Sequence, residues 1–135
     1  MVKLLVALIS LVTLASCQTS SVGSAKPLSP AALSHDYEKS PAEVRRKYDG
    51  REITVTGYTV EAAMVPEPGD DQGLVLLAER DSKPAQQVAC WFSEDQAAQF
   101  ATIEGGQLIT VQGIFNGESG VDLRFCKLVK QGKEN

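Results

Sequence analysis

Side chains that could carry catalysis are scarce in this sequence. The 135-residue chain has a single histidine, His35, and three cysteines. A Ser-His-Asp triad would have to use His35, yet Ser34 and Asp36 are its direct neighbours, and adjacent side chains cannot converge in that geometry. A zinc site needs several Cys and His ligands, and the glycine-rich phosphate-binding motifs are absent. We therefore expect no catalytic site, no metal and no cofactor, and we predict that the protein is not an enzyme.

The first cysteine, Cys17, follows a segment typical of an export signal. The apolar run from Leu4 to Ala15 is shorter than the about 20 residues that span a bilayer, and it matches the apolar core of a secretion signal. The segment ends Leu14-Ala15-Ser16-Cys17, which resembles the bacterial lipobox. This resemblance implies cleavage before Cys17 and attachment of a diacylglyceryl group to its sulfur. The alternative is a plain secretion signal with an incidental cysteine.

Lipidation predicts where the mature chain is located. Two or more acyl chains on one cysteine anchor a protein stably, so we expect the protein to bind a membrane through its lipid and to face the periplasm. Residue 18 is Gln rather than Asp, which in Gram-negative lipoproteins implies the outer membrane more often than the inner one. The predicted organisation is a signal peptide over residues 1–16, a flexible tether over 17–29 and one folded domain over 30–135, because small and polar residues dominate the tether.

The two remaining cysteines, Cys90 and Cys126, make an even number in an exported chain, which suggests a disulfide. The alternative is two reduced, buried cysteines that act as small apolar side chains. A redox-catalytic role is not expected, because the two are far apart in sequence and form no Cys-x-x-Cys motif.

The charge balance argues against non-specific binding of nucleic acids. The chain carries 13 basic and 17 acidic side chains and a formal net charge of −4, and removal of the signal takes away Lys3 alone. No basic stripe is visible in the sequence, and the one cluster, Arg45 to Lys47, is flanked by Glu43 and Asp49. Phosphate backbones are bound by Lys and Arg, so a nucleic-acid partner is not favoured.

The elements that must position these residues are mostly strands. Two short helical segments come first: Ser29-Pro30 can begin one, and Ser40-Pro41 begins another, with Glu43 in the capping-box position and Gly50 after its end. Apolar pairs four residues apart in these helices are expected to lie against the domain, namely Leu33 with Tyr37 and Val44 with Tyr48.

Alternating apolar residues then predict five strands: 51–62, 74–79, 86–92, 107–115 and 121–129. A turn-rich loop is expected over Val65 to Gly73, and a helix capped by Ser93 and Gln96 between the third and fourth strands. In the first strand the apolar phase slips at Val60, close to Gly57, which predicts a β-bulge. Asn116-Gly117 carries a hairpin signal.

One strand pattern occurs twice. "EITVTG" at Glu52–Gly57 returns as "LITVQG" at Leu108–Gly113. Five strands with a helix between the third and fourth is the plan of the OB-fold, a Greek-key barrel in which the first strand lies beside the fourth. We therefore predict a mainly β fold, a five-stranded OB-fold barrel with short N-terminal helices. The two look-alike segments would be antiparallel neighbours, each filling the barrel with Ile and Val and bending at its glycine.

The stretch from Leu33 to Val129 resembles the tRNA_anti-like OB-fold family, many of whose members are described as bacterial lipoproteins. "RRKYDGREITVTG" matches its Lys-Tyr-x-Gly-Lys followed by Val-x-Val-x-Gly, with Arg51 where Lys is common. "VACWF", "GGQLITVQG" and "LRFCKLV" match three further strand patterns of the family. The resemblance implies the barrel and says nothing about activity, because "tRNA" in the family name reflects a fold shared with anticodon-binding domains.

OB-folds bind ligands over the second and third strands, between the loop joining strands one and two and the loop joining strands four and five. The residues that this places at a candidate ligand site are Trp91, Asp70, Asp71 and Asn116. Trp91 alternates with inward-facing neighbours, so it is expected to point outward and to contact a sugar or a protein; the alternative is a Trp covered by the N-terminal helices. We expect an envelope protein or a glycan as ligand, with an oligonucleotide as the alternative.

Overall fold

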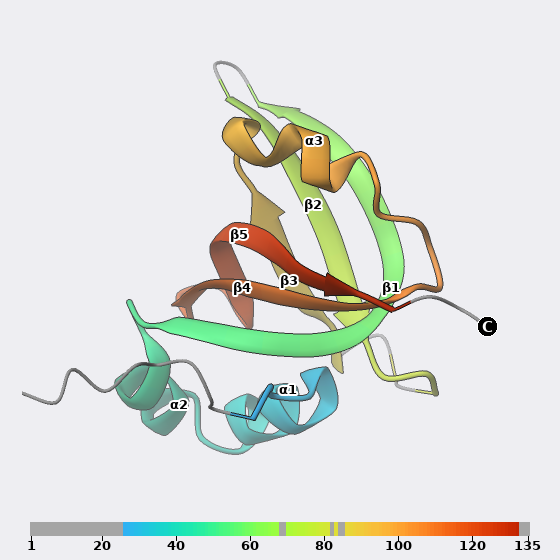
Figure 1. The fold of residues 1–135 in the computed structure, drawn as a ribbon. Helices are drawn as coiled ribbons and strands as arrows, with labels where there is room; N and C mark the ends of the chain where they lie inside the picture. The colour runs from blue at the N-terminus through green and yellow to red at the C-terminus, as the bar shows by residue number, and fades with distance from the viewer. Residues whose placement is uncertain (1–25, 68–69, 82, 84–85, 133–135) are drawn as a thin grey trace, which may run out of the picture.

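The computed structural model describes residues 26–67, 70–81, 83 and 86–132. The predicted signal peptide, Cys17 and most of the predicted tether lie outside these residues. The elements in chain order are α1 (Pro30–Lys39), α2 (Pro41–Tyr48), β1 (Glu52–Glu67), β2 (Asp70–Ala78), β3 (Val88–Phe92), the 3₁₀ segment η2 (Glu94–Gln96), α3 (Ala97–Phe100), β4 (Leu108–Asn116) and β5 (Asp122–Gln131). The strands form a closed barrel in the order β1-β2-β3-β5-β4 (Figure 1). The predicted fold class is confirmed.

The repeated segments pair as expected. Val55 lies opposite Val111 in the antiparallel β1–β4 ladder, and both side chains are fully buried. On the outer side of the same ladder, the hydroxyl groups of Thr56 and Thr110 share a hydrogen bond of 2.7 Å. The two copies of the repeat are therefore neighbouring strands with the same pattern, in which apolar residues face the core and threonines face outward.

The glycines that end the two repeats serve close packing. A Cβ at Gly57 would lie 2.6 Å from Cγ of Pro30, the first residue of α1, and a Cβ at Gly113 would lie 2.7 Å from Sγ of Cys126 on β5. Neither glycine has a positive φ. The two positions therefore need glycine because other parts of the chain occupy the space of a side chain.

Three β-bulges interrupt the barrel, and each carries an exposed apolar side chain. In β1 the register shifts between Thr59 and Glu61, which leaves Val60 unpaired and 51% exposed. This register shift confirms the predicted bulge. Thr59 remains buried, and Val60 points outward instead of becoming the next inward-facing residue. In β5 the register shifts leave Val129 and the neighbourhood of Phe125 outside regular pairing, and these residues are 56% and 71% exposed. An extra residue in a strand changes the side of the sheet to which its side chain points.

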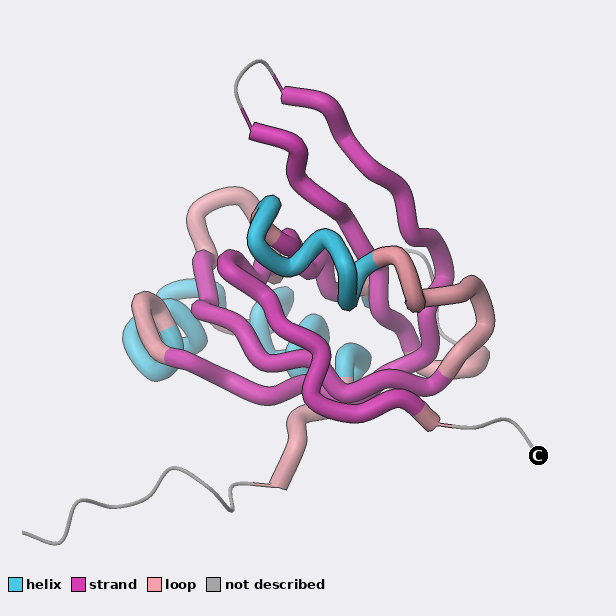
Figure 2. The backbone as a smooth tube through the Cα atoms, turned by 45° about the horizontal axis from the view of Figure 1, so that its top comes forward, coloured by secondary structure: helices cyan, strands magenta, loops and turns pink. Residues whose placement is uncertain are grey.

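The prediction of a loop over Val65 to Gly73 was wrong. β1 continues to Glu67 and β2 begins at Asp70, with Pro66 opposite Asp71 in the ladder. The β1–β4 ladder ends at Tyr58, and Thr59 still bonds the backbone of Gly106 and Gln107. Farther along, β1 is paired within the described residues with β2 alone, so a proline, which lacks the backbone N–H, is tolerated at this open edge. The resulting β1–β2 hairpin projects beyond the rest of the barrel (Figure 2).

The N-terminal helices cover one end of the barrel, and the predicted inward faces are confirmed because Leu33 and Val44 are buried. The preceding segment is fixed by Leu28, which donates its N–H to the Thr54 carbonyl at 2.9 Å and accepts from the Thr56 N–H at 3.1 Å. Ser29 caps α1 by accepting a hydrogen bond from the Ala32 N–H. These contacts attach the described end of the tether to β1.

Two predicted capping boxes do not form. Ser40 occupies the N-cap of α2 without a side-chain capping bond, and Pro41 follows it. Ser93 donates its hydroxyl to the Asp95 carboxylate. The helix predicted after Ser93 begins as a 3₁₀ turn and is shorter than expected, because the local Ser93–Asp95 contact competes with the helical cap.

Candidate ligand-binding site

Trp91 lies on the outer side of β3, between the buried residues Cys90 and Phe92. The parallel β3–β5 ladder pairs Cys90 with Leu123, which brings Arg124 beside Trp91. The Arg124 guanidinium carbon is 5.0 Å from the Trp91 ring centroid, a cation–π contact. The expected outward position of Trp91 is confirmed, and its side chain is half-buried.

The tyrosines of the N-terminal helices, which were the alternative candidates for covering Trp91, pack against other residues. Tyr37 donates its hydroxyl to the Gly117 carbonyl at 2.8 Å, and the Tyr48 ring lies 5.9 Å from that of Phe115. The side chain that partly covers Trp91 is therefore Arg124, which comes from a strand and not from a helix.

Phe125 is the most unusual residue of this surface. Its φ is +52°, and among the described residues no other non-glycine residue has a positive φ. The residue is 71% exposed, although it follows Arg124 directly and precedes the fully buried Cys126. A bulky residue in the left-handed region costs about 1–2 kcal/mol, and such strain persists where the surrounding structure compensates for it. Trp91, Arg124 and Phe125 are called the platform from here on.

The bulge explains how two consecutive side chains reach the same outer surface. In the β4–β5 ladder, Ile114 pairs with Arg124 and Gln112 pairs with Lys127, so Phe125 and Cys126 together face Gly113. Arg124 and Phe125 point outward and Cys126 turns inward. The space comes from Gly113, where a Cβ would lie 3.0 Å from the Arg124 carbonyl oxygen as well as against Cys126.

A small hollow opens at the platform. It has a volume of about 130 Å³ and is lined by Trp91, Phe92, Ser93, Arg124 and Phe125. Within the described part of the chain, only three buried side-chain nitrogen or oxygen atoms have no hydrogen-bond partner, and two of them, Trp91 Nε1 and Arg124 Nε, belong to this lining. Both atoms are donors, and a buried donor without an acceptor calls for an explanation.

The electrostatics at the platform depend on one acid. Asp122 Oδ2 is 3.8 Å from a terminal nitrogen of Arg124, whose side chain remains 38% exposed. Burial raises the pKa of Asp122, and the positive charge of Arg124 opposes this effect. The 3.8 Å separation is longer than a hydrogen-bonded ion pair, and the Arg124 side chain is partly exposed, so Arg124 keeps the ability to interact with an external anion.

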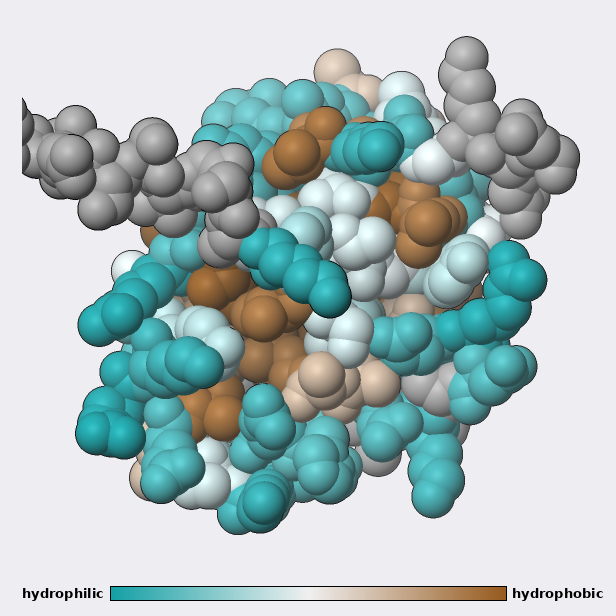
Figure 3. All heavy atoms as spheres, turned by 60° about the horizontal axis from the view of Figure 1, so that its bottom comes forward, coloured by the Kyte–Doolittle hydropathy of each residue, from teal (hydrophilic) through white to brown (hydrophobic). Residues whose placement is uncertain are grey.

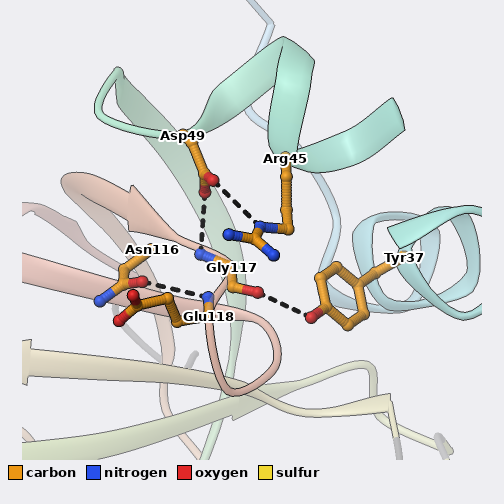
Figure 4. Close-up of polar contacts among 6 residues, drawn as sticks. All are labelled: Tyr37, Arg45, Asp49, Asn116, Gly117 and Glu118. Carbon is orange, nitrogen blue, oxygen red and sulfur yellow. Dashed lines mark hydrogen bonds and ion pairs between the residues drawn. The ribbon is translucent and has the colours of Figure 1, made fainter. Parts of the chain in front are cut away.

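The loop between β4 and β5, residues 117–121, is held by both N-terminal helices (Figure 4). The Gly117 N–H donates to Asp49 Oδ1 at 2.9 Å, while its carbonyl accepts from Tyr37. Asp49 is in turn paired with Arg45 at 3.2 Å. One rim of the expected ligand surface is thus fixed in advance, which lowers the entropy cost of binding.

Of the other predicted ligand-site residues, only Asn116 has a described side chain, and it makes its contact within its own turn. Asn116 uses its side-chain oxygen to accept a hydrogen bond from the Glu118 N–H at 3.1 Å, so it shapes the turn (Figure 4). Asp70 and Asp71 lie on the β1–β2 hairpin, before β2 begins to pair with β3 at Gly73, and their side chains lie outside the described part. Of the four predicted residues, Trp91 alone belongs to the platform.

Cys90 and Cys126 meet in the barrel interior, as expected for neighbouring strands. Both side chains are fully buried free thiols, so the predicted disulfide is not present in this structure. Hydrogen bonding to Cys126, followed by burial, raises the pKa of the Cys90 thiol well above its ordinary value. Each cysteine is adjacent in sequence to a platform residue, Cys90 to Trp91 and Cys126 to Phe125.

Other surface features compare poorly with the platform. A larger hollow of about 490 Å³ lies between α1 and α2, but Asp36 and Glu43 line it together with Lys39 and Lys47, so it has no consistent charge. On the face seen in Figure 3, apolar residues form separate patches divided by hydrophilic ones. The described residues contain no group of three or more Cys, His, Asp or Glu that could hold a metal. In the same residues, no helix is long and apolar enough to cross a membrane.

Sequence reasoning missed Arg124 and Phe125. One signal was available: the buried residues Leu123 and Cys126 of β5 are three apart, whereas a regular strand places inward residues two apart. This odd spacing indicates an inserted residue. It does not show which side chain the insertion exposes, because that depends on the strand opposite.

Comparisons with known proteins agree with this architecture. The tRNA_anti-like family matches over residues 2–127. The structure is similar to that of a proposed nucleic acid-binding lipoprotein from Klebsiella pneumoniae subsp. pneumoniae, with a TM-score of 0.67 and 17% identity over 77% of this chain and 92% of that chain. It is also similar to a chain of the yeast Stn1 and Ten1 structure, with a TM-score of 0.53 and 15% identity over 81% of this chain and 65% of that chain. At these identities the likeness concerns the fold alone. A comparison with curated proteins finds no match.

Proposed function

The chain belongs to the tRNA_anti-like family, and from this premise we propose that it is a lipid-anchored binding module of the bacterial cell envelope. The module has no catalytic activity of its own. It binds a protein through the platform, with the loop 117–121 as a fixed rim. Family membership supports the fold of the module, and the local structure at Phe125 supports the place of binding.

The proposed location is based on the N-terminal segment. Leu14 to Cys17 has the lipobox pattern, and the similar Klebsiella protein is described as a lipoprotein. Attachment through Cys17 keeps the domain on one face of the membrane, and Gln18 favours the outer membrane. Labelling cells with an alkyne fatty acid tests this: the wild-type protein is expected to incorporate the label and the Cys17→Ser variant to lose it. A mature wild-type chain without acyl groups would refute the anchor.

The observation that carries the binding proposal is the conformation of Phe125. An aromatic residue that is 71% exposed gains little from folding, and its φ of +52° costs free energy. A strained, exposed apolar residue is expected where function requires it. Arg124 and Trp91 line the same hollow as Phe125, and both residue types are enriched among the residues that dominate binding energy at protein interfaces.

A protein is better supported as ligand than a glycan. Sugar rings are bound by stacking on a free aromatic face, but the guanidinium of Arg124 lies over Trp91. Phe125 is then the one freely exposed aromatic ring of the platform, and a single ring without polar groups holds a glycan weakly. A partner protein can instead bury Phe125 and fill the adjoining hollow.

Oligonucleotide binding is the second candidate. The similar Klebsiella protein is described as a proposed nucleic acid-binding lipoprotein, and OB-folds often bind single strands. The net charge of −4 and the export signal oppose it. Titration with a labelled oligothymidylate at two salt concentrations discriminates, because binding through phosphates weakens steeply with salt.

Cross-linking in whole cells, followed by quantitative mass spectrometry, tests the site. Phe125→Asn removes the exposed ring, and Val60→Asn serves as the matched control because Val60 is also an exposed bulge residue, 51% exposed, on β1. The wild type and Val60→Asn are expected to capture the same partner protein, and Phe125→Asn to lose it. Equal recovery with all three proteins would refute the platform as the binding site.

A further inference from the structure

The outer side of β5 differs in charge from the rest of this acidic chain. Side chains of β5 that are at least partly exposed include three cations and two large apolar residues: Arg124, Phe125, Lys127, Val129 and Lys130. Sequence inspection shows no basic stripe, because inward residues separate these cations along the chain. The two bulges bring the apolar residues to the same side as the cations.

Among the described residues, two acids form ion pairs with the cations of this surface. Asp122 faces Arg124 but is only 21% exposed, and Glu52 lies 3.9 Å from Lys127 with both side chains about half exposed. An exposed pair of this kind contributes about 0–1 kcal/mol, so an external carboxylate can replace Glu52 at little cost. Lys130 has no ion pair within the described residues, and the neighbouring exposed residues of β4, Leu108 and Ile114, are uncharged.

The hollow at the platform suits one apolar side chain next to an oxygen acceptor. Its volume is about 130 Å³, slightly below the about 150 Å³ of an apolar cavity that holds benzene, and is therefore on the scale of one apolar side chain. Trp91 Nε1 and Arg124 Nε, the two donors without acceptors, belong to its lining residues. A peptide supplies an apolar side chain and a backbone carbonyl oxygen within one residue, and carboxylate oxygens on neighbouring acidic residues.

We infer that the platform together with Lys127, Val129 and Lys130 binds an acidic peptide segment of a partner protein, with one apolar side chain of that segment in the hollow. The inference rests on the proposed function and specifies the chemistry of the partner. An acidic glycan supplies anions but no apolar side chain that would fill the hollow and cover Val129. An oligonucleotide supplies anions and aromatic bases, but the net charge of −4 opposes it, and its binding is the competing outcome of the test. Complementary charges raise the association rate and the specificity.

Fluorescence anisotropy with defined probes tests the inference on the purified mature lipoprotein in neutral detergent. The first probe is a labelled dodecapeptide of glutamates around a central Leu-Phe pair, and the second has every Glu replaced by Gln. We expect the glutamate peptide to bind roughly tenfold more tightly, with an affinity that decreases with salt. Equal affinity for both peptides, or tighter binding of a labelled oligothymidylate, overturns the inference.

Charge-changing variants locate the contact. The double variant Lys127→Gln/Lys130→Gln should bind the glutamate peptide roughly tenfold more weakly, while the control Lys39→Gln/Lys47→Gln, on α1 and α2, leaves the affinity unchanged. Lys127→Glu/Lys130→Glu should prefer a lysine version of the peptide, a gain that a misfolded protein cannot produce. Equal weakening by both glutamine pairs, or no reversal of preference, overturns the assignment.

The same variants separate this inference from the proposed function. If Phe125→Asn loses the cellular partner while Lys127→Gln/Lys130→Gln retains it in full, the platform stands and the acidic-segment inference is wrong. If Phe125→Asn retains the partner, the proposed binding site itself is wrong.

Discussion

Gly113 and Cys126 are packed so closely across β4 and β5 that a Cβ at position 113 would lie 2.7 Å from the Cys126 sulfur. Gly113 ends the second copy of the repeat, on β4, and it lies opposite the bulge of β5. The glycine therefore connects the barrel core to the platform, because the chain segment that it accommodates is the one that turns Arg124 and Phe125 outward.

Gly113→Ala is expected to destabilise the protein by about 1–3 kcal/mol, because the new methyl group overpacks the core against Cys126 and the Arg124 carbonyl. Urea unfolding measures the effect. Gly105→Ala is the matched control: a Cβ there meets nothing within 4 Å, so stability should stay equal or rise by up to about 1 kcal/mol. The cost of Gly113→Ala should decrease in a Cys126→Ala background. Equal effects at positions 113 and 105 would contradict this packing.

Phe125→Asn should leave the free energy of unfolding unchanged or raise it by up to about 1 kcal/mol, because asparagine tolerates the left-handed conformation better than phenylalanine. The melting temperature, which measures this effect, should therefore stay the same or rise. Partner binding should be lost at the same time. Ile114→Asn, at a residue that is 36% exposed on β4, relieves no strain and should give no gain. A large drop in melting temperature for Phe125→Asn would show that the ring supports the fold.

Tyr37→Phe removes the hydroxyl that donates to the Gly117 carbonyl at 2.8 Å. We expect a loss of about 1 kcal/mol in stability and faster amide hydrogen exchange in residues 117–120. Tyr58→Phe is the control, since that hydroxyl accepts only a 3.4 Å contact from the exposed Arg80. Unchanged exchange in the loop for Tyr37→Phe would mean that α1 does not hold the rim.

The buried cysteine pair predicts a dependence on oxidation. If the chain is exported as proposed, we expect a periplasmic dithiol–disulfide oxidase to accept two electrons from Cys90 and Cys126, with release of two protons as the bond forms. Non-reducing gels after maleimide-polyethylene glycol treatment of denatured protein should show no addition without reductant and two additions with it. Reduction should cost about 3–4 kcal/mol of stability in the chain-entropy model. Full modification without reductant would establish the pair as permanently reduced.

The reduced protein should lose stability at alkaline pH. The pKa of Cys90 is raised in the folded state, so folding favours the protonated thiol; this contribution is complete below the ordinary value of 9.0 and declines as the pH rises above it. Urea unfolding at pH 8 and pH 10 in reductant measures the decline, with Cys90→Ala as the control that removes it. Identical pH dependence in the two proteins would refute this account.

Much of the fold follows from residue patterns that act locally. The twofold alternation of Ile53, Val55 and Gly57 predicts a strand with one inward face, and the copy at 109–113 predicts its neighbour. The hairpin at the end of β1 was mispredicted for a related reason: the turn residues were visible, but Pro66 is compatible with a strand only because its edge is open, which depends on where β4 stops.

The residue pattern alone predicts where the strands lie along the chain, the inward position of Cys90 and the outward position of Trp91, because each depends on period-two alternation within one segment. The antiparallel pairing of the two repeats was predicted from the order of the elements, which is that of the OB-fold. The platform, in contrast, depends on contacts between strands. The bulge at Phe125 depends on the space that Gly113 leaves on another strand, and Arg124 reaches Trp91 through the pairing of β5 with β3. The clamp between Tyr37 and Gly117 joins residues 80 positions apart. Such contacts between distant segments have no signature in either segment alone, and they arise only when the barrel closes.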